Sequence, residues 1–234
     1  MHESNQGEIK ILDPQNSLSQ VDTIIFDFDG TLFKGETFSL PIFQECLTIL
    51  IDEFHYNLDF PSEAKILAQF GRHSNDIYRT LLQNAKPDII ESFAECIENA
   101  EVKTLENGGG ELYEGVPEVL TELRKRNYKL ALCTNARKDY LEAVTKRFQL
   151  TNYFSVMYAA GQHNWKSKDW MISQIIKNLR TENFAVVGDR HHDIDAAKVN
   201  RGLSIGCAYG YGFGEVKKAD LVINDFRELL KLFP

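Results

Sequence analysis

The segment Phe26–Leu32, which reads Phe-Asp-Phe-Asp-Gly-Thr-Leu, constrains this chain more than any other feature. It follows the run Val21–Phe26, which is short, rich in β-branched residues and ended by a glycine turn, and which therefore predicts a buried strand. Ligands of open α/β sheets bind beyond the carboxyl ends of the strands, so Asp27 and Asp29 stand where a site is expected. Alternation along the strand lets both carboxylates point to one side, and two close carboxylates favour a bound cation. The alternative is an Asp-Gly turn with two solvated acids; we favour the site, because burying such a pair without a function would be costly.

Composition narrows the classes of protein that the chain can belong to. Its 234 residues suffice for one large domain or a domain with a smaller insertion. The net charge of -8 argues against a nucleic-acid partner, which clustered lysines and arginines would bind. No apolar run is long enough for a membrane partner, and residues 1–20 lack the apolar core of an export signal. We therefore expect a polar N-terminal tail over residues 1–20 and a cytoplasmic protein.

The four cysteines, Cys46, Cys96, Cys133 and Cys207, are scattered through apolar patterns and show no CxxC spacing. This distribution predicts small buried hydrophobic residues in a reducing compartment and argues against a metal–thiolate site.

Two different hydrophobic patterns follow the first strand along the chain. Residues 38–56, 61–70, 75–83 and 88–105 have helical spacing of apolar residues, and the glycines of 107–110 end that pattern. Strands and helices then alternate; expected helices are 116–126, 138–148, 169–179 and 194–200, and expected strands 128–133, 154–159, 184–187, 203–208 and 221–223. This alternation predicts an α/β fold with a Rossmann-like parallel sheet.

The domain organisation follows from these two patterns. We expect an α/β core of residues 21–33 and 111–234, interrupted by an inserted helical cap over residues 34–110. Glycines near both junctions, Gly35 and Gly108–Gly110, would let the cap move as a lid over the site.

Two later strand ends carry side chains that suit an anion. The hydroxyl of Thr134 and the amide of Asn135 can donate to an anionic oxygen, or can simply cap the next helix. Lys166 and Lys168 precede a predicted helix, where a lysine can hold a phosphate, neutralise paired acids or stay solvated.

A third strand end brings a second pair of acids. Asp189 follows the strand 184–187, and Asp193 lies four residues later. If a helix begins at Asp189, the two side chains lie on adjacent turns, where they can share a cation or a lysine; helix capping by one aspartate is the alternative.

Taken together, these four strand ends resemble the haloacid dehalogenase superfamily, and specifically its phosphoglycolate phosphatase-like branch with a helical cap. The resemblance covers about residues 21–226. Asp27–Thr31 matches the first family motif, Thr134–Asn135 the second and Gly188–Ile194 the fourth. The third motif often reads Lys-Pro, and neither lysine precedes a proline here; we prefer Lys168 and keep Lys166 as the alternative.

The resemblance implies phosphoryl transfer in two steps. Asp27 would be the nucleophile that forms an aspartyl-phosphate, and Asp29 the general acid and then the base. Mg²⁺ would be bound by the side chains of Asp27 and Asp189 and the backbone carbonyl of Asp29. Asp193 would orient a water or the lysine from outside the ligand set.

The remaining family positions would bind the phosphoryl group. Thr134 and Lys168 would act in catalysis and Asn135 in substrate binding, by sharing the charge of the transferring group with the metal. The resemblance thus implies a Mg²⁺-dependent phosphatase whose partner is a small phosphorylated metabolite, of the phosphoglycolate, nucleotide or sugar phosphate class. A phosphomutase, or a non-catalytic binding protein on this fold, is the alternative, and the sequence does not specify the oligomeric state.

Three further features have two interpretations each. The segment Gly71–Asn75 either contacts the substrate or forms an ordinary turn capped by Ser74, which we favour. Arg190 either touches the substrate or pairs with a nearby acid, which we favour. The aromatic residues of 209–213 either edge the pocket or pack on the core.

Overall fold

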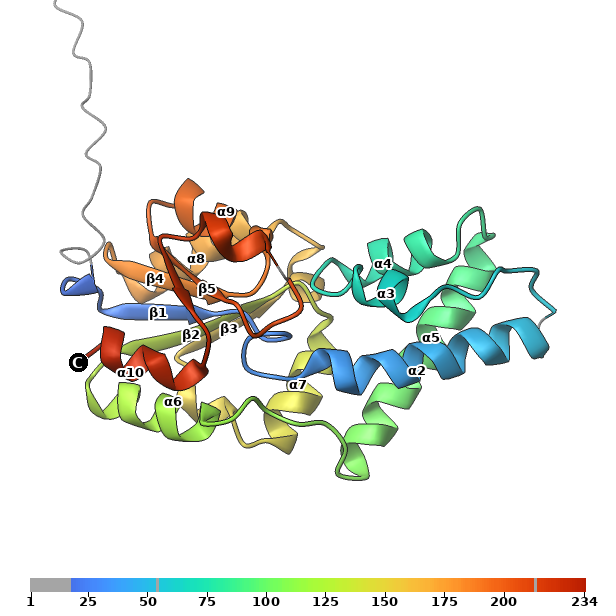
Figure 1. Ribbon diagram of the computed structural model, residues 1–234, viewed down its shortest axis with the longest axis horizontal. Helices are drawn as coiled ribbons and strands as arrows, with labels where there is room; N and C mark the ends of the chain where they lie inside the picture. Colours follow the sequence, from blue (N-terminus) through green and yellow to red (C-terminus); the bar gives the residue numbers. More distant parts are fainter. Residues whose placement is uncertain (1–17, 54, 213) are drawn as a thin grey trace, which may run out of the picture.

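The computed structural model describes residues 18–53, 55–212 and 214–234, and its centre is a parallel β-sheet (Figure 1). The six strands have the order β3-β2-β1-β4-β5-β6, and every neighbouring pair is parallel. Their bounds are β1 (Thr23–Phe26), β2 (Lys129–Thr134), β3 (Val156–Ala159), β4 (Phe184–Gly188), β5 (Leu203–Cys207) and β6 (Leu221–Ile223). The sheet confirms the α/β fold class that the alternating pattern predicts.

The register of the central strands aligns their carboxyl ends. Phe26, the last residue of β1, lies between Leu132 of β2 and Val187 of β4. The backbone N–H of Asp27 continues the ladder by donating to the carbonyl of Val187 at 2.8 Å. Polar residues that follow these strands therefore meet at one edge of the sheet.

Helices cover both faces of the sheet because the strands are apolar on both sides. These helices are α6 (Val116–Lys125), α7 (Lys138–Arg147), α8 (Lys168–Leu179), α9 (His191–Val199) and α10 (Leu229–Leu232). Ile24 and Phe26 of β1 belong to one hydrophobic cluster, whereas Ile25 belongs to the cluster that includes Met171 and Ile172 of α8. Alternate residues of one strand thus hold opposite layers together.

A second group of helices stands beside the carboxyl edge of the sheet (Figure 1). It consists of α2 (Gly35–Asp52), α3 (Glu63–Leu67), α4 (Ser74–Leu81) and α5 (Pro87–Glu106). The rings of Phe43, Tyr78 and Phe93 pack at centroid distances of 5.6–6.1 Å and join α2, α4 and α5. All four expected helices are present, but α3 begins at Glu63 rather than at residue 61, because the Ser62 side chain caps it by accepting from the Lys65 N–H.

The prediction for the cysteines was wrong at two positions. Cys46 of α2 and Cys96 of α5 form a disulfide, with their Cα atoms 5.8 Å apart. The sequence contains no signal for this pair, because the packing of α2 on α5 brings together residues that are 50 positions apart. Cys133 and Cys207 are buried free thiols, as expected. The cysteine pattern therefore no longer argues for a reducing compartment.

Among the described residues, no helix combines the length and the apolar character that crossing a bilayer requires. The greater part of the expected N-terminal tail lies outside the described residues.

Candidate active site

Three carboxylates meet at the carboxyl edge of the sheet. Asp27 follows β1, Asp189 follows β4, and Asp193 lies in the first turn of α9. Their oxygens lie within 4.8 Å of one another, and their exposed fractions are 3%, 0% and 1%. The close approach needs a glycine at position 30, which has a φ of +79° and whose missing Cβ would lie 2.5 Å from Asp189 Oδ2.

The expected placement of Asp189 and Asp193 on adjacent helical turns was wrong. The helix α9 begins at His191, so Asp189 precedes it and reaches the cluster from the end of β4. The two side chains still meet, because the carboxylate of Asp193 folds back onto the start of its own helix. There its Oδ2 accepts from the backbone N–H of Arg190 at 3.0 Å.

Lys168, the first residue of α8, lies between two of the acids. Its Nζ is 2.8 Å from Asp27 Oδ1 and 2.6 Å from Asp193 Oδ1. Burial alone would lower the pKa of Lys168, but the two carboxylates outweigh burial and raise it. Lys166 is exposed at the surface. The structure therefore places Lys168, and not Lys166, among the acids.

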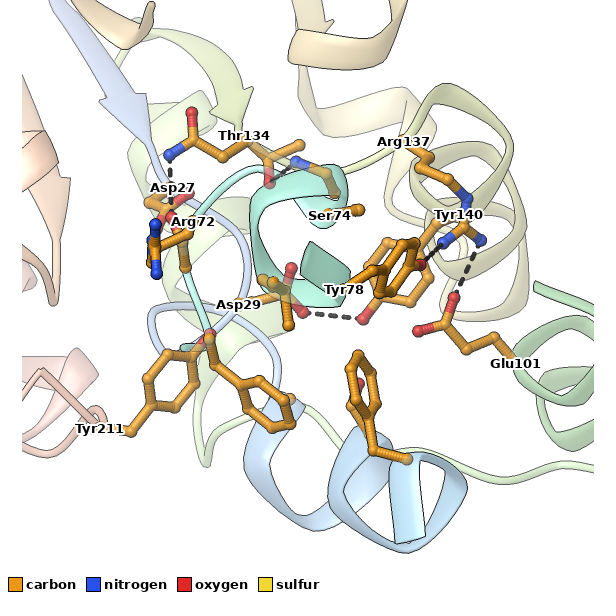
Figure 2. Close-up of a pocket in the computed structure, with 18 residues that line it drawn as sticks. Asp27, Asp29, Arg72, Ser74, Tyr78, Glu101, Thr134, Arg137, Tyr140 and Tyr211 are labelled. Atoms are coloured by element: carbon orange, nitrogen blue, oxygen red, sulfur yellow. Dashed lines mark hydrogen bonds and ion pairs between the residues drawn. The ribbon is translucent and has the colours of Figure 1, made fainter. Parts of the chain in front are cut away.

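Asp29 lies at the wall of a cavity beside this cluster. Its Oδ1 accepts a hydrogen bond of 2.7 Å from the hydroxyl of Tyr140, a buried residue of α7 (Figure 2). Desolvation raises the pKa of Asp29 to about 7 and that of Asp27 to about 6. Sequence reasoning missed Tyr140, which is 111 residues away and belongs to an ordinary amphipathic pattern.

Thr134 and Asn135 are both buried where β2 ends. The Thr134 hydroxyl accepts from the N–H of Ala136 at 3.2 Å, so it also serves the turn that leads to α7. Asn135 Nδ2 donates to the carbonyl of Gly71 at 2.8 Å, while its Oδ1 has no hydrogen-bond partner in the described chain. The structure thus brings both residues to the edge at which Asp27 lies.

The acid cluster has the features of a cation site. Asp189 Oδ2 accepts from the N–H of Gly212 at 3.0 Å, but its buried Oδ1 finds no partner among the residues that the structure describes. Burial and the neighbouring Asp27 and Asp193 raise the pKa of Asp189 well above its usual value. One lysine cannot neutralise three buried carboxylates, and an all-oxygen set of this kind fits Mg²⁺.

A cavity separates this edge from the group α2–α5 (Figure 2). Asp27, Asp29, Thr134 and Asn135 line one side of it. The other side is formed by residues of α2, α4, α5 and the α3–α4 turn, among them Ser39, Phe43, Gly71, Arg72, Tyr78 and Glu101. The segment Gly71–Asn75 joins α3 to α4 as a turn, as favoured, but the expected cap was wrong, since His73 and not Ser74 occupies the N-cap position. Gly71, Arg72 and Ser74 also line this cavity, so a contact with the substrate stays a prediction.

Arg190 pairs with an acid, as expected. Its Nε and Nη2 each lie 3.0 Å from the carboxylate of Glu215. Burial would raise the pKa of Glu215, but hydrogen bonds from Arg190 and His191 lower it to about 2. Arg190 Nη1 also donates to the carbonyl of Phe70, so this residue ties the sheet edge to the α3–α4 turn.

The turn after β5 contains two tyrosines with different positions. Tyr209 donates to the carbonyl of Thr31 at 2.9 Å, whereas Tyr211 lines the cavity and packs edge-on against Phe70. The hydroxyl of Tyr211 is buried and has no hydrogen-bond partner within the described residues. Phe213 lies outside the described residues.

Comparison with known proteins assigns this geometry to a family. The family model of haloacid dehalogenase-like hydrolases matches residues 24–204, and the chain belongs to this family. A phosphoglycolate phosphatase of Aliivibrio fischeri is 28% identical over 88% of this chain and 94% of its own length. The pyrophosphatase PpaX of Bacillus cereus is 23% identical over 91% of this chain and 96% of its own.

A solved structure has the same fold. It is a predicted phosphoglycolate phosphatase from Haemophilus somnus, with a TM-score of 0.81 and 22% identity over 92% of this chain and 99% of that one. The resemblance expected from the four strand ends is thereby confirmed. The protein is an enzyme of the phosphatase type within this family.

Proposed function

We propose that the protein is a Mg²⁺-dependent phosphatase that hydrolyses a small phosphomonoester through an aspartyl-phosphate. The phosphoglycolate, nucleotide and sugar phosphate classes are the candidates for its substrate. The observation that carries the proposal is that Asp27 and Asp29 line one cavity while Lys168 Nζ lies 2.8 Å from Asp27 Oδ1.

Asp27 would be the nucleophile. Its Oδ1 is held by Lys168 at 2.8 Å, so the carboxylate is oriented and its charge is partly balanced. An oxygen of Asp27 would attack phosphorus, form the acyl phosphate and displace the alcohol oxygen. A pKa of about 6 leaves this carboxylate mostly ionised at neutral pH.

Asp29 would move the proton. A pKa of about 7 means that an appreciable fraction of its side chain carries a proton at neutral pH. This proton would pass to the departing alcohol oxygen, and the resulting carboxylate would then take one from the water that hydrolyses the acyl phosphate. The hydrogen bond from Tyr140 fixes the orientation of the carboxylate for both steps.

The phosphoryl oxygens would be bound by Lys168, Thr134 and Asn135. Losing one donor of this kind typically costs about 2.7–4 kcal/mol of transition-state stabilisation. Mg²⁺ would be held by the side chains of Asp27 and Asp189 and by the backbone carbonyl of Asp29. Asp193 would orient a water or the lysine from outside the ligand set. The ion would supply positive charge to the transferring group.

We also propose that residues 34–110 form a cap on a core of residues 21–33 and 111–234. Contacts of Gly71 with Asn135 and of Phe70 with Arg190 support this division, because they join the two parts at the cavity. A small phosphorylated metabolite is the partner that such a cavity suits, and the cytoplasm remains a prediction of the sequence alone.

The test is phosphate release from a panel of phosphomonoesters, with and without Mg²⁺, for wild type and Asp27→Asn. We expect Mg²⁺-dependent release that the substitution abolishes, while the exposed control Lys166→Ala retains it. No release from any substrate, including 4-nitrophenyl phosphate, would contradict the proposal. Isomerisation of a sugar phosphate that needs a bisphosphate activator would instead establish the phosphomutase alternative.

A further inference from the structure

A buried ion pair forms the wall of the cavity that lies away from Asp27 (Figure 2). Arg137, which precedes α7, places its Nη2 2.9 Å from Oε2 of Glu101 on α5. Both side chains are buried and both line the cavity. Arg137 Nη1 donates to the hydroxyl of Tyr78 at 3.2 Å, which brings a third element into the same wall.

Three carboxylates surround the guanidinium of Arg137, whose Nε forms no hydrogen bond within the described residues. Its Nε lies 3.0 Å from Glu98 Oε1 and 3.3 Å from Asp139 Oδ1. Each of its three nitrogens thus faces a protein oxygen, and three carboxylates surround one positive charge. A carboxylate on the substrate would therefore meet the negative charge of Glu101 beside an arginine whose charge is already balanced by carboxylates of the protein.

Arg72 does not change this conclusion. Its Nη1 donates to Gln69 at 2.5 Å and to Thr80 at 3.3 Å, which are neutral partners, so its charge is open to an anion. It shares a second cavity with Asn135 and Lys168, the two residues proposed to bind the phosphoryl group. Arg72 also lines the cavity of Glu101, and we assign its positive charge to the phosphoryl side because Asn135 and Lys168 are its neighbours in the second cavity.

The surroundings of Glu101 suit an uncharged group with several hydroxyls. The ring of Phe43 and the hydroxyl-bearing side chains of Ser39, Tyr78 and Tyr140 share the cavity with it. Aromatic faces pack against C–H groups, and a carboxyl oxygen is a strong partner for hydroxyl donors. Burial raises the pKa of Glu101 to about 7, and both of its protonation states form hydrogen bonds with a hydroxyl.

We propose that Glu101, held by Arg137, selects phosphomonoesters whose leaving group is an uncharged polyol, as in sugar phosphates, and disfavours leaving groups that carry a carboxylate. This inference rests on the proposed phosphatase function and narrows its substrate class. It separates this chain from its relatives named phosphoglycolate phosphatase, because phosphoglycolate carries a carboxylate at the position that Glu101 would face.

The experiment compares kcat/KM for ribose 5-phosphate, phosphoglycolate and phosphoethanolamine in the presence of Mg²⁺, with 4-nitrophenyl phosphate as a reference for phosphatase activity. We expect wild type to prefer ribose 5-phosphate over phosphoglycolate by at least about tenfold. Glu101→Gln should lower that ratio roughly 10- to 100-fold, mostly through KM, since it removes a charged hydrogen-bond acceptor. The control Glu95→Gln changes an exposed glutamate of the same helix and should leave the ratio unchanged.

Each other outcome decides against the inference in a recognisable way. The inference is overturned if wild type prefers phosphoglycolate or phosphoethanolamine, or if Glu101→Gln leaves the ratio unchanged. In both cases, hydrolysis of 4-nitrophenyl phosphate would show that the proposed phosphatase function still holds. Loss of all activity in wild type, including that reference, contradicts the proposed function itself. If Glu101→Gln does not fold, Tyr78→Phe replaces it: this variant frees Arg137 Nη1, so the rate with phosphoglycolate should rise, and an unchanged rate overturns the inference.

Discussion

Replacing Asp189 by asparagine should stabilise the metal-free protein while it abolishes phosphate release. Asp189 is fully buried, and its Oδ1 has no hydrogen-bond partner among the described residues. Asparagine keeps the acceptor for the Gly212 N–H and replaces the unpaired oxygen by an amide that can donate to Asp27 or Asp193. Removing one unsatisfied buried acceptor recovers about 1–3 kcal/mol in the free energy of unfolding.

The gain should grow with pH. The folded-state pKa of Asp189 lies well above the ordinary value of 3.8. The stability that such an acid contributes is fully present below its unfolded pKa, and it is lost as the pH rises through the folded pKa. Metal-free wild type should therefore lose stability from about pH 4 upward relative to Asp189→Asn, by about 1.36 kcal/mol for each unit of pKa shift. The test of the sign is that the two proteins converge at low pH.

The assay is urea denaturation in EDTA and in Mg²⁺, at pH 5 and pH 8. At a hundredfold excess over its dissociation constant, Mg²⁺ should stabilise wild type by about 2.7 kcal/mol and leave Asp189→Asn unaffected. The control Asp195→Asn changes an exposed aspartate of α9 and should behave as wild type. The reasoning fails if Asp189→Asn is less stable than wild type in EDTA at pH 8.

Three further expectations concern other contacts. The chain-entropy model gives about 4 kcal/mol for a disulfide that closes a loop of 50 residues, so reduction or Cys46→Ala should lower the free energy of unfolding by that order. Two results would refute the Cys46–Cys96 bond: a urea midpoint that does not change with dithiothreitol, or four titratable thiols instead of two in the unreduced denatured chain. Lys168→Met should abolish phosphate release and, by leaving two buried carboxylates without their cation, cost about 3–5 kcal/mol in metal-free unfolding experiments, whereas Lys166→Met should change neither quantity. Tyr140→Phe should slow the hydrolysis of alkyl phosphates roughly tenfold and that of 4-nitrophenyl phosphate much less. The reason is that a good leaving group does not need the acid, Asp29, that this hydroxyl orients. Equal losses with both substrates would show a purely structural role.

The strands and the acidic turn could be predicted because their signals are local. An apolar β-branched run such as Ile24–Phe26 has no solvent-facing pattern, so it belongs in a sheet covered on both faces. The next residues, Asp27 to Thr31, contain two acids and a glycine whose φ is positive. Each of these properties depends on a few neighbours in the chain, and so each can be inferred without the fold.

The remaining parts of the site depend on pairs that lie far apart in the chain. Tyr140 and Asp29 are separated by 111 positions, and Arg137 and Glu101 by 36. No periodicity signals either pair, because each partner also fits an ordinary helical or turn pattern. Lys168 was preferred, but Lys166 stayed an alternative for the same reason, since only the buried acids around Lys168 distinguish the two.

The sequence by itself thus determined the α/β class, the succession of strands and helices along the chain, and the residues at the strand ends. These follow from the side-chain period, the turn residues and short motifs. Only the tertiary structure decided which side chains face one another: the lysine among the acids, the Cys46–Cys96 bond, and the wall of Arg137 and Glu101. The physical reason is that such contacts are set by how helices pack against one another and against the sheet, and that packing involves the whole chain at once.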